Sequence, residues 1–327
     1  MQTIKELKIL ISEEINREII RLNKTEPTNL YEPIGYTLAM GGKRLRPVLV
    51  LMACNLFTDK IEKALPAALA IEVFHNFTLL HDDIMDQADM RRNSLAVHKK
   101  YNPNIAILSG DAMSIMAYNY LQKSETENLA QMIRLFSDTA LEVCEGQQYD
   151  MDFETRMNVS IPEYLNMIRL KTAVLLACSL KMGALAANAP ERTADLLYVF
   201  GLDLGIAFQL QDDLLDVFAD QEKFGKKIGG DIISNKKTFL LLKALELSDD
   251  PTKKELLDWI EKGEFDHQEK IMAVKNIYTK LKIKEITENN IEDFYQSALD
   301  VLNEIDVAKE TKAEMVALAK MIMSRDH

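Results

Sequence analysis

Two acidic motifs have the residue types and the spacing expected of a divalent-cation site. Each reads D-D-x-x-D and follows an apolar run, and together they contain the candidate metal ligands Asp82, Asp83, Asp86, Asp212, Asp213 and Asp216. On a helix, aspartates four residues apart, such as Asp82 and Asp86, lie on one face and can share a cation. Mg²⁺ binds proteins through one or two carboxylates and takes its other ligands from water and substrate phosphates. The motifs therefore predict a phosphate-bearing substrate.

A solvated helix end is the alternative interpretation of either motif taken alone, because short motifs match by chance. Both motifs, however, directly follow runs that look buried, the second of them at residues 199–210. Carboxylates beside a core are rarely left without a partner, since an isolated buried charge is costly. Two such motifs favour a metal site over a solvated surface.

A basic turn precedes the first acidic motif, at G-G-K-R-L-R-P, residues 41–47. Lys43, Arg44 and Arg46 cluster there behind two glycines, and we expect Pro47 at the first position of the following helix. Arginine binds phosphate through a planar fork, lysine adds a point charge, and glycine lets the backbone approach closely. The turn is a candidate phosphate site, with a basic helix junction of no function as the alternative.

A second basic segment directly follows the second acidic motif. It contains glycines at 225, 229 and 230 and the candidate residues Lys223, Lys226, Lys227, Lys236 and Lys237. The chain as a whole has a formal net charge of −12. A dense basic segment beside carboxylates in such a chain is better explained by phosphate binding than as a solvated face.

Two helical positions carry further candidates. His75 lies seven residues before Asp82, two turns earlier on the same face, which favours a role at the site over a hydrogen-bonded core histidine. Lys171 and Thr172 place a cation and a hydroxyl in an otherwise apolar helix. Because a buried lysine must find an anion or lose its charge, this pair is also a candidate for binding phosphate.

The elements that must position these residues are predicted to be helices. Helical patterns cover residues 2–24, 30–40, 46–57, 63–89, 105–123, 126–150, 161–186, 194–220 and 239–327. The helix at 63–89 is apolar nearly all round, so we expect it in the middle of the fold. Since neither strand-like alternation nor a linker composition interrupts the pattern, we predict an all-α fold in one domain, residues 1–327.

Composition limits the classes of function. The net charge disfavours nucleic-acid binding. No uninterrupted apolar stretch reaches membrane length, and the N-terminal segment is amphipathic, so it resembles neither a signal peptide nor a membrane span. Cys54, Cys144 and Cys178 lack ligand-like spacing and lie in apolar helical contexts, which predicts reduced core thiols. We expect a cytoplasmic protein.

The signals occur in a fixed order along the chain. G-G-K-R-L-R-P is followed by D-D-x-x-D with an R-R pair, then K-T, then F-Q-x-x-D-D-x-x-D, then a G-K-x-x-G-x-D segment ending in N-K-K-T. Over roughly Ala39 to Lys243 this order and spacing resemble the trans-isoprenyl diphosphate synthases, the head-to-tail prenyltransferases. One departure is Asn93, which stands where that family usually has glycine after the arginine pair and leaves the shape of the loop open.

The resemblance implies a homodimeric, isoprenoid-synthase-type helical bundle with a central cavity between facing acidic helices. The enzyme would condense isopentenyl diphosphate with an allylic diphosphate, using about three Mg²⁺ ions per active site, with Mn²⁺ as a substitute. Asp82, Asp86 and Asp212 would bind the ions directly. Asp83, Asp213 and Asp216 would contact them through water.

The resemblance also assigns the substrate pockets. The allylic diphosphate would be held by Arg91, Lys171, Thr172, Gln209, Lys227 and Lys236, with Lys226 as an adjacent candidate for the role of Lys227. The isopentenyl diphosphate pocket would use Gly42, Lys43, Arg46, His75 and Arg92. The catalytic residues, which stabilise the charge on the departing diphosphate, would be Asp82, Asp86, Asp212, Lys171 and Lys227.

Product length in the resembling family follows from the depth of an apolar tunnel beside the first acidic helix. Phe77 lies five residues before Asp82, and Thr78 lies four residues before it. One aromatic residue here resembles the pattern of geranylgeranyl-forming members, so we predict a C20 product. Farnesyl (C15) and longer polyprenyl products stay open, as does ordinary core packing for Phe77.

Two other functions share parts of the pattern. A terpene cyclase would have the fold and an aspartate-rich helix, but it typically lacks the second D-D-x-x-D and needs no isopentenyl diphosphate pocket. A non-catalytic prenyltransferase subunit has usually lost one acidic motif, whereas both are intact here. A helical scaffold without activity would leave the acidic and basic clusters unexplained. The sequence therefore favours the enzyme.

Overall fold

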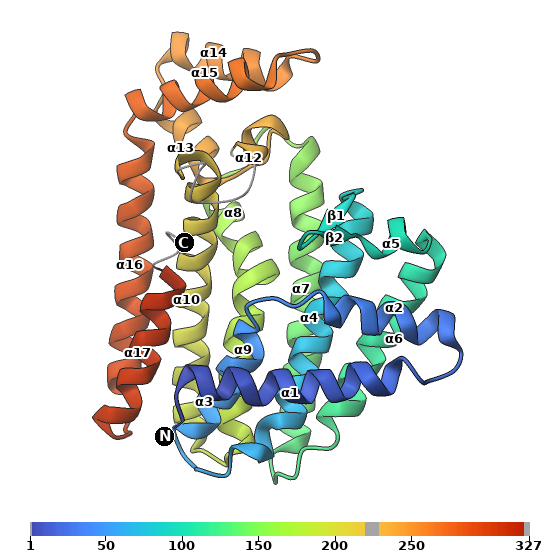
Figure 1. Ribbon diagram of the computed structural model, residues 1–327. Coiled ribbons are helices and arrows are strands. Elements are labelled where there is room, and N and C mark those ends of the chain that lie inside the picture. Colours follow the sequence, from blue (N-terminus) through green and yellow to red (C-terminus); the bar gives the residue numbers. More distant parts are fainter. Residues whose placement is uncertain (1, 220–228, 324–327) are drawn as a thin grey trace. The chain divides into compact units, whose positions relative to one another are not determined.

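The computed structural model describes residues 2–219 and 229–323, and most of them are helical (Figure 1). The long helices are α1 (Ile4–Leu22), α2 (Thr28–Ala39), α3 (Leu45–Asn55), α4 (Leu65–Met85), α6 (Pro103–Leu121), α7 (Leu129–Thr155), α9 (Val174–Ala186), α10 (Glu191–Phe218), α14 (Asp250–Glu261), α15 (His267–Lys280), α16 (Ile283–Glu304) and α17 (Lys309–Met323). Shorter elements are α5 (Val97–Lys100), α8 (Ile161–Ile168), α12 (Gly230–Ile233), α13 (Phe239–Leu247), a 3₁₀ turn (Ile61–Ala64) and a π-helical segment (Arg169–Ala173). Strands β1 (Met90–Arg91) and β2 (Ser94–Leu95) form an antiparallel pair. The predicted all-α fold is confirmed.

Side-chain caps explain where several helices begin. Thr3 and Glu6 form a capping box at α1, and Ser160 and Glu163 form another at α8. In each, the hydroxyl accepts from a backbone N–H of the first turn while the glutamate accepts from the N–H of the cap residue. The side chain of Asn102 accepts from the third residue of α6, whose first residue is a proline. Local sequence therefore fixes these boundaries.

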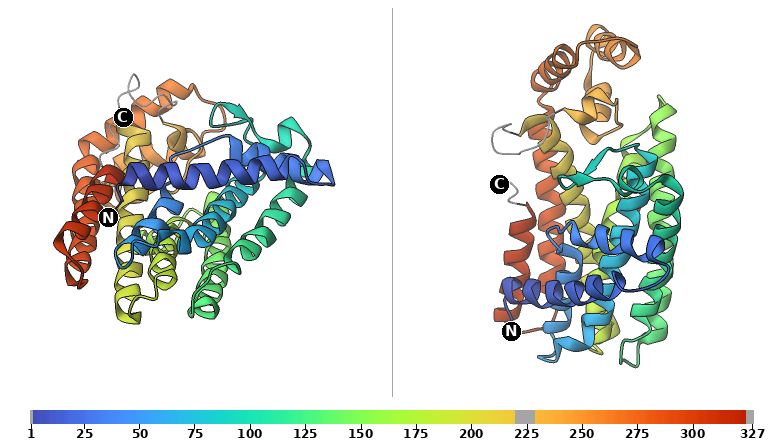
Figure 2. Two further views of the ribbon diagram at one scale, coloured as in Figure 1. Left: turned by 60° about the horizontal axis from the view of Figure 1, so that its bottom comes forward. Right: turned by 45° about the vertical axis from the view of Figure 1, so that its right-hand side comes forward.

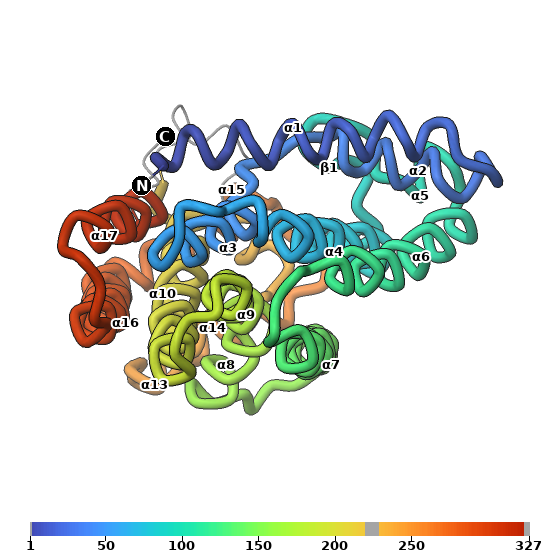
Figure 3. Tube along the Cα trace, turned by 90° about the horizontal axis from the view of Figure 1, so that it is seen from below, coloured from blue at the N-terminus to red at the C-terminus, as the bar shows by residue number. Residues whose placement is uncertain are grey.

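The chain divides into two compact units. The first comprises Met1–Asp138, Cys178–Tyr198 and Ile305–Met315. Within it α4 packs against α3 and α6, and α1 packs against α2 (Figure 3). Residues 67–74 of α4 are at most 3% exposed, so α4 is the core helix of this unit, as its apolar surface predicts.

The second unit comprises Thr139–Ala177, Val199–Glu304 and Val316–His327. Its core is a hydrophobic cluster to which α8, α10, α13, α15 and α16 all contribute. Helices α13, α14 and α15, in the orange part of the chain, pack against one another (Figure 2). This core supports the C-terminal part of α10 and the segment that begins at Gly229. The single domain that the sequence predicts stays a prediction.

Three details differ from the expected elements. The helix expected over 63–89 ends at Met85, and Gln87 adopts a φ of 52° as the chain turns toward β1. The helix expected over 161–186 is interrupted by the π-helical segment. Pro47 is the third residue of α3 instead of the first, still in the first turn, where its missing N–H breaks no helical hydrogen bond.

The structure also bears on two further expectations, the burial of the cysteines and the presence of helices of membrane length. Cys54 and Cys178 are buried, but Cys144 is exposed, so the prediction of a core thiol is wrong at that position. Among the described residues, α10 is long and apolar enough to cross a membrane, with a mean hydropathy of 1.3 over its best window. More than half of that window, 56%, is buried inside the protein, and core helices meet the same criterion.

Candidate functional site

The first acidic motif lies at the C-terminal end of α4, in the first unit. Asp86 is the capping residue, and its N–H donates to the carbonyl of Asp82 at 2.8 Å, so the two aspartates stay one turn apart. Asp83 is 3% exposed, and its Oδ1 accepts from Nε and Nη2 of Arg91 at 2.9 and 2.5 Å. The middle aspartate is thus paired with an arginine, while Asp82 is half-buried and Asp86 exposed.

The hairpin formed by β1 and β2 carries the arginine pair. Arg91 is on β1, and Arg92 and Asn93 are the two turn residues, with φ of 51° and 61°. A type I′ turn requires positive φ at both positions. Asparagine enters the left-handed region more readily than most residues, so it can occupy a position where glycine is usual. The departure at Asn93 therefore leaves the hairpin formed.

Arg92 connects this hairpin to the basic turn before α3. Its Nη1 donates to the carbonyl of Gly41. Its guanidinium lies against Gly42, where an added Cβ would be 2.7 Å from Cζ of Arg92. Gly42 also has a φ of 132°, which residues with a Cβ rarely adopt. Both the backbone and the neighbouring arginine therefore require glycine here.

His75 and Arg46 form the next contact of this region, with Nη1 of Arg46 3.1 Å from Nε2 of His75. Burial, and then the charge of Arg46, lower the pKa of His75 well below its usual value, so the ring is neutral near pH 7. Because arginine can only donate, Nε2 is the acceptor. The structure thus gathers in the first unit the residues expected to bind isopentenyl diphosphate: Gly42, Lys43, Arg46, His75 and Arg92.

The second acidic motif lies in the last turns of α10, in the second unit. Asp213 is 4% exposed and accepts from the hydroxyl of Tyr164 and, at 2.9 Å, from Nε2 of Gln209. Burial, and then the charge of Asp231, raise the pKa of Asp213. The outer aspartates of the motif are half-buried. As in the first motif, the middle aspartate is held inside the protein.

The π-helical segment presents the predicted lysine and threonine. Nζ of Lys171 lies 2.5 Å from Oδ2 of Asp150 on α7, and the hydroxyl of Thr172 donates to Oε1 of Gln209 at 3.0 Å. Since Gln209 in turn donates to Asp213, a hydrogen-bonded chain leads from Thr172 to the acidic motif. π-Helical turns are rare and occur often at functional sites.

Two glycines let neighbouring helices approach this segment. A Cβ added at Gly146 on α7 would lie 2.3 Å from the backbone N of Lys171. A Cβ added at Gly205 on α10 would lie 2.6 Å from Cα of Ala173. The segment is therefore packed at backbone distance against α7 and α10, which fixes the positions of its side chains.

Segment 229–238 lies beside the second acidic motif, in the second unit. The N–H of Asp231 donates to Oδ2 of Asp216 at 3.0 Å, and the N–H of Gly229 donates to the carbonyl of Asp216 at 2.7 Å. Burial raises the pKa of Asp231, and the charge of Lys236 opposes that rise. Lys236, predicted to bind diphosphate, therefore lies within electrostatic range of the aspartates.

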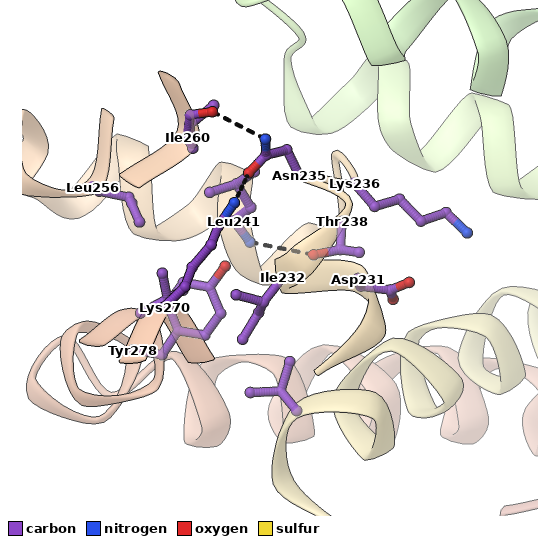
Figure 4. A pocket seen from close by; sticks show the side chains of 12 residues that line it. Asp231, Ile232, Asn235, Lys236, Thr238, Leu241, Leu256, Ile260, Lys270 and Tyr278 are labelled. Carbon is purple, nitrogen blue, oxygen red and sulfur yellow. Dashed lines mark hydrogen bonds between the residues drawn. The ribbon is translucent and has the colours of Figure 1, made fainter. Parts of the chain in front are cut away.

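Figure 4 shows how the end of this segment is supported. Asp231 and Lys236 lie on one side of a small pocket, and the buried Lys270 of α15 lies on the other. Nζ of Lys270 donates to Oδ1 of Asn235 at 2.6 Å, and Nδ2 of Asn235 donates to the carbonyl of Ile260 at 3.0 Å. Asn235 is thereby fixed directly beside Lys236.

The donor set fits Mg²⁺ held partly by a substrate. Within residues 2–219 and 229–323, no three His, Cys, Asp or Glu side chains converge into a preformed metal cage. Each acidic motif instead offers two outer carboxylates one turn apart, Asp82 with Asp86 and Asp212 with Asp216. Mg²⁺ binds in this way because it keeps several waters and takes phosphate ligands.

Some predicted residues were placed by the structure and some were not. Lys223, Lys226 and Lys227 lie in residues 220–228, outside the described part of the chain. The sequence reasoning missed the residues that hold the predicted ones: Glu72, Asp150, Tyr164 and Asp231. A signal existed for Glu72, a carboxylate inside an apolar helix three residues before His75.

Phe77, the predicted determinant of product length, belongs to a row of rings in the first unit. Its ring centroid lies 4.8 Å from that of His81 and 5.4 Å from that of Phe74. Phe74 is 3% exposed and packs edge-on against Phe136, at 5.1 Å. Phe77 itself is half-buried, and the hydroxyl of Thr78 donates to the carbonyl of His75 at 2.8 Å.

Known proteins are similar to this chain in sequence and in fold. The profile of the polyprenyl synthetase family matches residues 27–279. A geranylgeranyl diphosphate synthase of Methanosarcina mazei is 42% identical over 77% of each chain. A geranylfarnesyl diphosphate synthase of Natronomonas pharaonis is 37% identical over 77% of this chain and 81% of its own. A crystal structure of a geranylgeranyl pyrophosphate synthase is 46% identical, covers 100% of both chains and superposes with a TM-score of 0.94.

Proposed function

Because the chain belongs to the polyprenyl synthetase family, we propose that it joins isopentenyl diphosphate head to tail to an allylic diphosphate, with geranylgeranyl diphosphate (C20) as its main product. The observation that carries the proposal is that both acidic motifs share one internal arrangement. In each, the middle aspartate is buried and bonded to the protein, and two outer aspartates remain one turn apart. The names of the similar synthases support the C20 product.

In this proposal three of the four outer aspartates bind metal directly. Asp82, Asp86 and Asp212 would be the direct ligands of magnesium, and Asp83, Asp213 and Asp216 would act through water or by orienting their neighbours. When bound, Mg²⁺ supplies positive charge that stabilises the negative charge growing on the departing diphosphate.

The chain's own cations hold the two diphosphates. Arg91, Lys171, Thr172, Gln209, Lys236 and Lys227 are assigned to the allylic diphosphate, with Lys226 as the alternative to Lys227. The cationic members favour cleavage of the allylic C–O bond because they offset charge on the leaving oxygen. Lys43, Arg46 and Arg92, with Gly42 and the neutral ring of His75, hold isopentenyl diphosphate.

Bond making then follows from charge. Cleavage of the C–O bond leaves an allylic cation, and the double bond of isopentenyl diphosphate attacks it to form the new C–C bond. A proton leaves the extended chain, and the departing diphosphate is the proposed acceptor. Water would capture the cation, so the reaction requires that water be kept out of the site.

The rings at Phe77 support the proposed C20 product. The ring of Phe77 packs edge-on against His81 and at a tilt against Phe74, so it cannot swing aside without losing ring contacts and can block a growing tail. The relative named for geranylfarnesyl diphosphate makes a C25 product the nearest longer alternative. A farnesyl (C15) product is the shorter alternative.

The test is product formation by the purified protein. It is incubated with Mg²⁺, labelled isopentenyl diphosphate and a C5, C10 or C15 allylic diphosphate, and the products are dephosphorylated and sized by chromatography. We expect a C20 alcohol. Label-free hydrocarbon from the allylic substrate alone would indicate a cyclase, and binding without any product would indicate a non-catalytic subunit.

A matched pair of variants on α10 sharpens the test. Asp212→Asn should reduce kcat by about 10²-fold or more, because it removes charge from the proposed metal site. Asp203→Asn, on the same helix, removes a carboxylate that is bonded to Ser297 and should leave kcat nearly unchanged. A chelator should abolish activity, and added Mg²⁺ or Mn²⁺ should restore it.

We also propose a homodimer and a cytoplasmic location. Ile107, Leu108 and Ile115 form an exposed apolar stripe on α6, at 45%, 60% and 62% exposure, of the kind that marks protein interfaces. Ile115→Glu should shift the protein to monomers in analytical ultracentrifugation. Ile20→Glu, at a 59% exposed position on α1, is the control. Cell fractionation tests the location.

A further inference from the structure

Arg44 differs from the other two cations of the basic turn. Lys43 is exposed and Arg46 half-buried, whereas Arg44 is only 9% exposed and has a φ of 53°. Residues with a Cβ rarely adopt this left-handed conformation unless their surroundings hold them in it. Arg44 therefore adopts a strained backbone conformation in which its side chain is directed into the protein.

An ion pair inside the first unit holds Arg44. Its Nη1 donates to Oε1 of Glu72, and its Nη2 donates to the carbonyl of Leu38 at 2.6 Å. Glu72 is 2% exposed, and its Oε1 also accepts from Nδ2 of Asn76 at 2.8 Å. One guanidinium thus ties together the last turn of α2, the basic turn and the middle of α4. Arginine suits this role because its planar fork bonds in two directions at once.

The ion pair between Arg44 and Glu72 lies on the face of α4 that carries His75. Glu72, His75 and Asn76 are spaced three and four residues apart, which places them on one side of the helix. The turn contacts this face twice, through Arg44 at Glu72 and through Arg46 at His75. Two contacts one helical turn apart fix both the position and the rotation of the turn, whereas a single contact would leave it free to pivot.

The charges of this region also favour a positioning role. Glu72 pairs with Arg44 and its charge also acts on Arg92, while Arg46 and Arg91 add positive charge near His75 and Arg91 is paired with Asp83. The buried carboxylate bonds directly to Arg44, the cation that points inward. The region keeps a net positive charge, which suits a diphosphate.

We propose that Arg44 and Glu72 are positioning residues for isopentenyl diphosphate: without touching the substrate, their pair sets Lys43 and Arg46 in register with His75. This inference deepens the proposed function and rests on it. Arg44 thus has a structural role, whereas Lys43 and Arg46 are the cations of the turn that bind the diphosphate.

Arg44→Lys isolates the geometry, because it keeps the charge but loses the fork. If charge alone mattered, this variant would bind isopentenyl diphosphate normally. We expect its KM for isopentenyl diphosphate to rise about tenfold to a hundredfold, since a misplacement of about 1 Å at a binding group is that costly. The KM for the allylic diphosphate should change less than about twofold, because other residues hold that substrate.

A double variant separates positioning from folding. Arg44→Met with Glu72→Met replaces the buried pair by apolar side chains of similar size, an exchange that proteins often tolerate without loss of stability. We expect this variant to fold and still to show the raised KM for isopentenyl diphosphate. Arg21→Lys is the matched control, because Arg21 also pairs with a glutamate in the first unit, at Glu18.

The measurements are steady-state kinetics in each substrate, calorimetric binding of isopentenyl diphosphate alone, and thermal unfolding. Folded variants with an unchanged KM and affinity for isopentenyl diphosphate would overturn the proposal, and so would an equal rise in KM for both substrates. In either case an active unmodified protein would leave the proposed function standing. An unmodified protein that neither binds nor extends with isopentenyl diphosphate would overturn both.

Discussion

Replacing Gly146 by alanine should displace the π-helical segment that carries Lys171 and Thr172. The added Cβ would lie 2.3 Å from the backbone N of Lys171 and 2.7 Å from the carbonyl carbon of Leu170. Comfortable contacts between such atoms begin at about 3.5 Å, so α7 and the segment must separate by roughly 1 Å. Both neighbouring atoms belong to the backbone, and therefore no change of rotamer can relieve the contact.

The expected loss of stability is modest and the expected loss of activity is large. Overpacking of this kind costs about 1–3 kcal/mol, and alanine returns up to about 1 kcal/mol through its better helix propensity. The net destabilisation of about 1–2 kcal/mol should lower Tm by only a few degrees in a chain of this length. A shift of about 1 Å in a group that holds substrate costs about 10²-fold in rate.

The assay compares kcat/KM for the allylic diphosphate with Tm in the same preparation. Gly263→Ala is the matched control, because an added Cβ there meets no atom within 4 Å and the backbone is outside the left-handed region. We expect the control to match the unmodified protein in both quantities. Should Gly146→Ala keep its activity within about twofold, the close packing of α7 does not position Lys171, and the reasoning fails.

Two further predictions concern the first unit. Phe77→Ala should lengthen the products beyond C20, because it removes a ring from the row at Phe74 and His81, whereas Phe57→Ala should not; chromatography of the dephosphorylated products decides. Burial and Arg46 lower the pKa of His75, so below about pH 6.5 the unfolded chain binds a proton that the folded chain does not, and the free energy of unfolding should fall by up to about 1.4 kcal/mol per pH unit. In urea titrations between about pH 6.5 and 5, His75→Gln should flatten that decline and His267→Gln should not.

Sequence reasoning predicted correctly those positions that depend on the spacing of residues within one helix. The D-D-x-x-D pairs keep their one-turn spacing because they lie on or at the end of helices, and α4 shows its central place by being apolar all round. His75 was predicted from its alignment with Asp82, and the structure places it against Arg46. That both acidic motifs bind one diphosphate stays a prediction.

Features set by contacts between distant segments could not be predicted in this way. The π-helical turn at Lys171 depends on the close approach of Gly146 and Gly205, which lie on other helices. Nothing in the local pattern of residues 161–186 distinguishes this turn from a continuous α-helix. Similarly, the inward direction of Arg44 depends on a carboxylate 28 residues away, although the preceding residue, Lys43, is exposed.

The two acidic motifs share one internal arrangement, but their middle aspartates are held by different kinds of residue. Asp83 forms an ion pair with Arg91, so part of the negative charge of the first motif is already neutralised within the protein. Asp213 is held by neutral donors, and in its neighbour Asp231 burial, followed by repulsion from further carboxylates, raises the pKa. Such a cluster favours the binding of cations more strongly, because each added positive charge also relieves that repulsion. We therefore expect the second motif, more than the first, to depend on its metal and on Lys236 for stability.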